Sequence, residues 1–96
     1  MKKEEIVNFL HQLKDEIRKE YKAEIKGIFG SFVRGEEKPG SDLDVLVEFD
    51  KGANLLHLTG LSIFLEQKLG IPVDIVPFDA VREEIKEHVL KETVYL

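Results

Sequence analysis

The stretch Gly30–Asp44, with the sequence GSFVRGEEKPGSDLD, decides how this chain folds. It contains a Gly-Ser pair, an arginine three residues after the serine, and two aspartates separated by one residue. Apolar runs lie directly before and after it, IKGIF at 25–29 and VLVEF at 45–49. These runs predict two strands, at 24–29 and 42–49, which could pair as an antiparallel, hairpin-like unit. The polar connection between them carries side chains that are suited to chemistry.

Side chains along a strand alternate between its two faces, and this alternation separates the polar from the apolar residues of the second strand. One face carries Asp42, Asp44, Leu46 and Glu48, and the other, which we expect to face a core, carries Leu43, Val45, Val47 and Phe49. The two aspartates are then about 6.6 Å apart on one face. At an effective dielectric constant of ~20 their charges repel by roughly 2.5 kcal/mol, so a cation between them is expected.

A third aspartate, Asp74, lies in another apolar run, VDIV at 73–76, within a strand predicted at 71–76. It alternates with Val73 and Ile75 and therefore points away from the core face. Carboxylate oxygens are hard ligands, so the expected ion is Mg²⁺, with Mn²⁺ as the other candidate. Three such carboxylates suit a pair of ions about 3.5–4 Å apart, the geometry for in-line displacement at phosphorus.

The residues that follow the first strand are suited to binding phosphate. Gly30 lets an anion approach the backbone without a Cβ in the way, and a helical turn capped by Ser31 and ended by Gly35 would point free N–H groups at it. Arg34 could reach a phosphate or hold an aspartate through two hydrogen bonds. An anion-binding corner beside metal ligands matches a nucleoside triphosphate with bound Mg²⁺.

The remaining segments predict an α+β fold, a small mixed sheet of about three strands with helices packed on one side. Apolar residues at helical spacing predict helices at 2–20, 54–69 and 80–91. Asn54 and Asp79 are candidate N-caps for the last two, and Gly70 is a candidate residue for ending the middle one. The helix at 54–69 is apolar on more than one side, and the terminal TVYL is apolar too. Both features suggest surface that a partner covers.

Length and composition narrow the function classes. The chain has 96 residues, which predicts a single domain, 1–96. A net charge of −5 makes direct binding of nucleic acid unexpected. There is no cysteine, and no run is long enough for a signal peptide or a membrane span. We therefore expect a cytoplasmic protein without disulfides, thiolate-bound metal or a membrane partner.

The motifs GSFVRG, SDLDVLV and VDIV together resemble the DNA polymerase β-type nucleotidyltransferase superfamily, and its minimal nucleotidyltransferase branch in particular. The resemblance extends over nearly the whole chain. It implies the nucleotidyltransferase fold and a two-metal transfer of a nucleoside monophosphate. By this resemblance Asp42 and Asp44 would hold both metals, and Asp74 would hold one and help deprotonate the acceptor hydroxyl. Gly30 and Ser31 would bind the triphosphate, with Arg34 as a supporting residue.

Members of this branch pair with a helical HEPN-domain toxin, so the resemblance also implies a partner and a hetero-oligomer. The chain would be the antitoxin, transferring AMP from ATP to a hydroxyl of that toxin, with a tyrosine as the expected acceptor. Two other functions stay open at this point. The chain could neutralise its partner by binding alone, or it could be a metal-dependent nuclease, although its acidic charge argues against the nuclease.

Overall fold

The computed structural model describes all 96 residues and confirms an α+β fold. In chain order the elements are α1 (Lys3–Tyr21), β1 (Ala23–Phe29), α2 (Ser31–Arg34), β2 (Leu43–Phe49), α3 (Leu55–Leu69), β3 (Val73–Pro77), the 3₁₀ turn η1 (Phe78–Ala80), α4 (Glu83–Glu92) and β4 (Val94–Tyr95). The three predicted strands are present. The apolar tail adds a fourth, β4, so it is used within the sheet rather than left for a partner.

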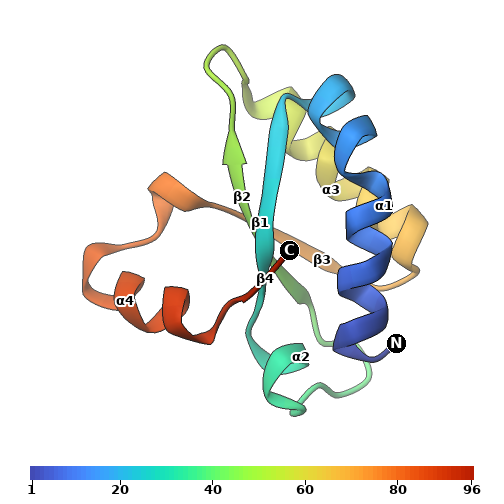
Figure 1. The fold of residues 1–96 in the computed structure, drawn as a ribbon, viewed down its shortest axis with the longest axis vertical. Coiled ribbons are helices and arrows are strands. Elements are labelled where there is room, and N and C mark those ends of the chain that lie inside the picture. The colour runs from blue at the N-terminus through green and yellow to red at the C-terminus, as the bar shows by residue number, and fades with distance from the viewer.

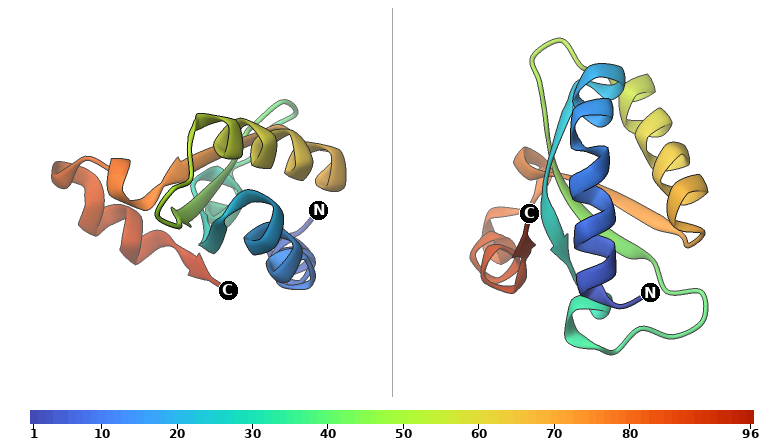
Figure 2. Two further views of the ribbon diagram at one scale, coloured as in Figure 1. Left: turned by 90° about the horizontal axis from the view of Figure 1, so that it is seen from above. Right: turned by 45° about the vertical axis from the view of Figure 1, so that its right-hand side comes forward.

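The four strands form one mixed sheet in the order β3-β2-β1-β4. β1 pairs antiparallel with β2, as the hairpin-like prediction requires, and also with β4. β2 and β3 are parallel, and α3 makes the crossover between them. Helices α1 and α3 lie side by side on one face of the sheet, whereas α4 lies away from them, on the other side (Figures 1 and 2). None of the helices has the length and apolar character that crossing a bilayer would need.

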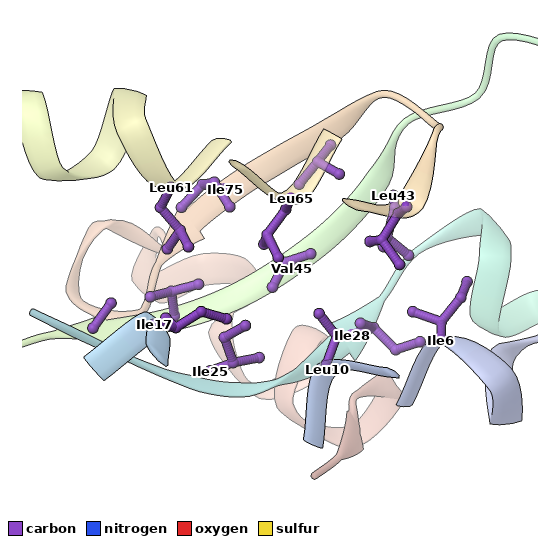
Figure 3. Packing of buried hydrophobic residues seen from close by; sticks show 14 of the residues in the cluster. Ile6, Leu10, Ile17, Ile25, Ile28, Leu43, Val45, Leu61, Leu65 and Ile75 are labelled. Atoms are coloured by element: carbon purple, nitrogen blue, oxygen red, sulfur yellow. The ribbon is translucent and has the colours of Figure 1, made fainter. Parts of the chain in front are cut away.

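The hydrophobic core fills the space between α1, α3 and the inner face of the sheet (Figure 3). Ile6, Leu10 and Ile17 of α1 are fully buried, at the spacing of one helix face. They meet the inward-facing residues of β2, such as Val45, and Leu65 of α3. This packing fixes the strands from behind and leaves their other face available for a site.

Gly27, at an irregularity in β1, allows the short strand β4 to pair with it. The register between β1 and β2 shifts between Ile25 and Gly27. A Cβ on Gly27 would lie 2.3 Å from the carbonyl oxygen of Val94, so only glycine lets β4 come this close. The C-terminal segment after α4 is thereby attached to the sheet beside β1.

Two of the predicted helix starts are wrong. Gly30, not Ser31, is the N-cap residue of α2, and no side-chain bond caps that turn. Asp79 does not cap α4 either, because it lies in η1; the chain is extended at Val81, and α4 begins only at Glu83. The other predicted ends are confirmed: the Asn54 side chain accepts hydrogen bonds from two N–H groups of α3, and Gly35 and Gly70 end their helices in the left-handed conformation.

Candidate functional site

Three strands bring a phenylalanine and two carboxylates into one row across the outer face of the sheet. Asp44 of β2 is the register partner of Asp74 in the parallel pair with β3, and of Phe29 in the antiparallel pair with β1. Neighbouring strands lie about 4.8 Å apart, so side chains at the same register on one face are in contact distance. The nearby charge of Asp74 accordingly raises the pKa of Asp44. The predicted meeting of these two aspartates on one face is therefore present.

The start of β3, which carries Asp74, is held by contacts from β2 and α3. The backbone N–H of Leu43 donates to the carbonyl of Pro72 at 2.8 Å. The N–H of Val73 donates to a carboxylate oxygen of Glu66 at 2.9 Å. Glu66 lies on α3, so the helix that covers the core also fixes the register of β3. These bonds hold Asp74 opposite Asp44.

Asp42 lies farther out than the other two aspartates. It is exposed and precedes β2, whose first residue is Leu43. Its charge is close enough to raise the pKa of Asp44, but no group of three His, Cys, Asp or Glu side chains is gathered closely enough to hold an ion between them. The structure thus joins two of the three predicted ligands directly and leaves the third beside them.

Asp44 is the most perturbed of these groups. Its burial, followed by the negative charges of Asp74 and Asp42, raises the pKa of Asp44 to about 6 from an ordinary value of 3.8. The nearby charge of Arg34 acts in the opposite direction. A carboxyl that is difficult to ionise among other carboxyls is a place where a divalent cation would be favourable.

Gly30 is in direct contact with Asp44, at the point where β1 ends. Its backbone has φ 84° and ψ −155°, a combination that is essentially restricted to glycine. A Cβ at this position would lie 2.1 Å from the Oδ2 atom of Asp44. The requirement for glycine next to the acidic pair therefore has two causes, the backbone conformation and the space that the carboxyl occupies. Ser31, half-buried, follows as the first residue of α2.

Arg34 is held by two glutamates rather than by an aspartate. Its Nε donates to Glu36 at 2.8 Å, and its Nη1 donates to Glu92 near the end of α4. The Glu92 side chain is only 12% exposed, so this ion pair connects α2 to α4 in a partly protected position. No local sequence pattern indicates this role for Glu92, because 58 residues separate it from Arg34.

The site thus places the paired carboxyl groups of Asp44 and Asp74 beside Gly30. Comparison with known proteins identifies the family of the chain. The model of the nucleotidyltransferase domain family matches residues 10–96. The chain belongs to this family. The family resemblance inferred from GSFVRG, SDLDVLV and VDIV is therefore confirmed, together with its fold.

Individual relatives of this nucleotidyltransferase domain support the minimal branch. Protein adenylyltransferase MntA of Thermococcus cleftensis is 41% identical over 93 residues, which cover 97% of this chain and 94% of the relative. The solved structure of a minimal nucleotidyltransferase has a TM-score of 0.81 at 34% identity and covers 100% of this chain and 97% of its own. A crystal structure of a toxin-antitoxin with AMP-PNP shares the fold, with a TM-score of 0.70 at 19% identity over 92% of this chain and 69% of its own.

The donor set of the acidic pair fits a hard divalent cation. Asp44 and Asp74 provide carboxylate oxygens from paired register positions on one face of the sheet. Asp42 is near enough for its charge to raise the pKa of Asp44. These residues could thus hold Mg²⁺.

Proposed function

We propose that this nucleotidyltransferase is a protein adenylyltransferase, an antitoxin that transfers AMP from ATP to a hydroxyl group of a partner toxin with a HEPN domain. One observation carries the proposal: Asp44 and Asp74 meet on the outer face of the sheet, directly beside Gly30. The 41% identity to the MntA protein adenylyltransferase supports the choice of AMP and of a protein acceptor. We further propose that residues 1–96 act as one minimal domain in the cytoplasm.

Each residue of the site has a role in this proposal. Gly30 and Ser31 bind the triphosphate, since the glycine backbone leaves room for it and the serine hydroxyl can donate. Asp74, which is exposed, accepts the proton of the acceptor hydroxyl. The hydroxyl oxygen then bonds to the α-phosphorus, the bond from that phosphorus to the bridging oxygen breaks, and pyrophosphate leaves. Arg34 supports the phosphate side, held in place by Glu36 and Glu92.

Asp42, Asp44 and Asp74 would hold Mg²⁺, with two ions expected and Mn²⁺ as an alternative. When bound, such ions supply positive charge that stabilises the attacking and leaving oxygens. The protein's own contribution is to bring the carboxylates together and to shield Asp44 from water. Removing the ion with a chelator should therefore stop transfer without unfolding the chain.

The direct experiment incubates the chain with its partner toxin, ATP and Mg²⁺ and follows the mass of the intact toxin. We expect the toxin to gain the mass of one AMP, and the gain to disappear when a chelator is added. GTP, CTP and UTP in separate reactions test the choice of adenine. A toxin that stays unmodified under all these conditions while the chain still neutralises it would contradict adenylyl transfer.

A toxin that is neutralised without being modified would mean that the chain is an antitoxin that acts by binding alone. One observation favours a surface for such binding. Leu55 and Leu56 at the start of α3 are 74% and 80% exposed, which is unusual for adjacent leucines. Leu56→Glu should weaken binding of the toxin if this surface contacts it. Phe64, by contrast, packs against the ring of Tyr21 with centroids 5.3 Å apart, so it is not part of that free surface. If binding alone neutralises the toxin, Asp44→Asn leaves neutralisation intact and Leu56→Glu removes it.

A further inference from the structure

The carboxylate of Glu92 connects the end of α4 to Arg34, the last residue of α2. Its Oε1 atom accepts a hydrogen bond from the Nη1 atom of Arg34. The other ion pairs of α4 join residues that are close in the sequence, such as Glu87 with Lys91 at 3.0 Å. Glu92 therefore provides the ion pair by which α4 reaches the residues that follow β1.

The chain around Glu92 fixes the point from which its side chain starts. Val89, one turn earlier, is buried, and the Oγ1 atom of the buried Thr93 donates to the Val89 carbonyl at 2.7 Å. The next two residues form β4, which pairs with β1 at Gly27 and Ile28. Figure 1 shows the chain passing from α4 into β4 beside β1. The backbone at Glu92 is thus attached to the sheet.

The two glutamates that bind Arg34 differ in how firmly they can hold it. The Glu36 side chain is 64% exposed, whereas that of Glu92 is 12% exposed. Water screens an exposed ion pair, and the pair must also order a mobile side chain, so it contributes little. A carboxylate that its surroundings already order holds its partner at a smaller cost in entropy. Glu92 is therefore the partner that sets the direction of the Arg34 guanidinium.

The two ion pairs leave part of the Arg34 guanidinium free for a further anion. Glu36 accepts from Nε and Glu92 accepts from Nη1, so neither takes a bond from Nη2. A guanidinium has five N–H donors in a fixed plane, and Nη2 carries two of them. The charge of Arg34 opposes the rise in the pKa of Asp44, so the guanidinium lies near the acidic pair. Nη2 is thus the atom available to a phosphate oxygen beside that pair.

We propose that Glu92 is a positioning residue for the nucleotide, which fixes Arg34 so that Nη2 donates to the triphosphate. This assignment rests on the proposed function, in which Arg34 supports the phosphate side. A guanidinium that is oriented before the nucleotide arrives loses less entropy on binding, so Glu92 increases the affinity for ATP. The C-terminal segment, which brings Glu92 to Arg34, thereby takes part in binding the nucleotide.

Two other roles for this ion pair predict different results when the charge of Glu92 is removed. If Glu92 competes with phosphate for Arg34, its removal raises the affinity for the nucleotide. If Glu92 only attaches α4 to α2, its removal lowers stability and leaves the affinity unchanged.

The first test measures the affinity of the full chain for AMP-PNP with Mg²⁺ by isothermal titration calorimetry. Glu92→Gln keeps the size of the side chain and should weaken binding about threefold to tenfold, with Tm lowered by less than about 4 °C. Glu87→Gln is the matched control, because it removes a carboxylate from an ion pair of the same helix that does not involve Arg34. It should bind AMP-PNP as the wild type does. An unchanged or raised affinity in Glu92→Gln would overturn the assignment.

The second test determines whether the effect of Glu92 passes through Arg34. In an Arg34→Ala background, Glu92→Gln should change the affinity for AMP-PNP by less than about twofold. A loss as large as in the wild-type background would show that Glu92 acts by another route, and would overturn the assignment. The Nε–H NMR signal of Arg34 should also shift in Glu92→Gln and stay in place in Glu87→Gln. The signals of Arg18 and Arg82, the other arginines of the chain, serve as references.

The third test, the modification of the toxin, separates this assignment from the proposed function. Glu92→Gln should raise KM for ATP about threefold to tenfold and leave kcat within about twofold. If the variants show the expected affinities for AMP-PNP but the toxin never gains AMP, the proposed function fails and the role of Glu92 stands. If wild type and Glu92→Gln modify the toxin with the same KM for ATP, the role of Glu92 fails and the proposed function stands.

Discussion

The two faces of β2 show how one strand can serve both stability and chemistry. On the inner face Leu43, Val45 and Val47 are fully buried against α1 and α3. On the outer face, Asp44 has a carboxyl group that its surroundings make difficult to ionise. The inner face is packed as folding requires, whereas the outer face holds like charges that folding does not favour. The difference indicates that the outer face is maintained for function, supported by the packing behind it.

The largest effect should come from the outer face. We expect Asp44→Asn to lower the rate of AMP transfer about 1,000-fold, because that factor corresponds to losing about 4 kcal/mol of transition-state stabilisation. Glu48→Gln also replaces a carboxylate by an amide on that face of β2, four residues after Asp44, and should leave transfer almost unchanged. The measurement is the initial rate of toxin modification. Equal losses for the two variants would mean that Asp44 has no special role.

The next effect separates the inner face from exposed positions. Leu65→Ala, in the middle of the core, should lower the free energy of unfolding by about 2–5 kcal/mol. Leu56→Ala on the same helix should change it by less than about 0.5 kcal/mol, because Leu56 is 80% exposed. Urea denaturation of both variants checks the pair. A large loss in Leu56→Ala would show that the exposed leucines are needed for the fold and are not a free surface.

A smaller effect should appear at the corner where the two faces meet. Gly30→Ala should destabilise the fold by about 1–3 kcal/mol and also impair transfer, because its Cβ would displace the Asp44 carboxyl. Gly35→Ala is the control: Gly35 also has a positive φ, 72°, but a Cβ there meets no atom within 4 Å. It should destabilise by about 1 kcal/mol and leave transfer intact. If both variants lose transfer equally, the contact between Gly30 and Asp44 is not important.

The smallest effect is a pH dependence of the ion-free protein. The pKa of Asp44 is 3.8 ordinarily and about 6 in the folded chain, so the fold favours its protonated form. The resulting stability is complete below about pH 4 and is lost as the pH rises through about 6. After allowance for screening of a half-buried group we expect about 1 kcal/mol, or about 4–8 °C in Tm.

Asp44→Asn isolates this contribution. In the presence of a chelator, the Tm of the variant relative to wild type should rise as the pH increases from about 4 to about 7. Glu48→Gln should show no such change. A difference that stays constant with pH would mean that Asp44 titrates normally, and that the outer face is not electrostatically unfavourable.

Local sequence signals predicted most of the fold. The Asn54 cap, Gly70 at the end of α3 and the alternation along β2 all depend on residues that are neighbours in the sequence. The structure confirms each of them. The helix predicted at 80–91 begins only at Glu83, because the chain forms η1 first and is extended at Val81. Leu46 is on the predicted face with the aspartates, yet it is fully buried, since that face is only partly open.

The site was predictable in composition but not in geometry. The sequence could indicate that Asp44 and Asp74 share a face, but their register depends on the crossover through α3 and on the bond from Val73 to Glu66. The pairing of Arg34 with Glu92 depends on where α4 returns to the sheet. Such long-range placements follow from tertiary packing, which no local pattern specifies.

The central claim is that the acidic pair on the outer face binds the divalent ion that accompanies the nucleotide. Adding Mn²⁺ in small amounts to the isotope-labelled chain with AMP-PNP, and following the loss of backbone NMR signals, tests it most directly. We predict that the signals of Asp44, Asp74 and Gly30 disappear first, and that Asp44→Asn abolishes this selectivity. Broadening that begins instead at the exposed glutamates of α1 and α4, with no preference for β2 and β3, would contradict the claim.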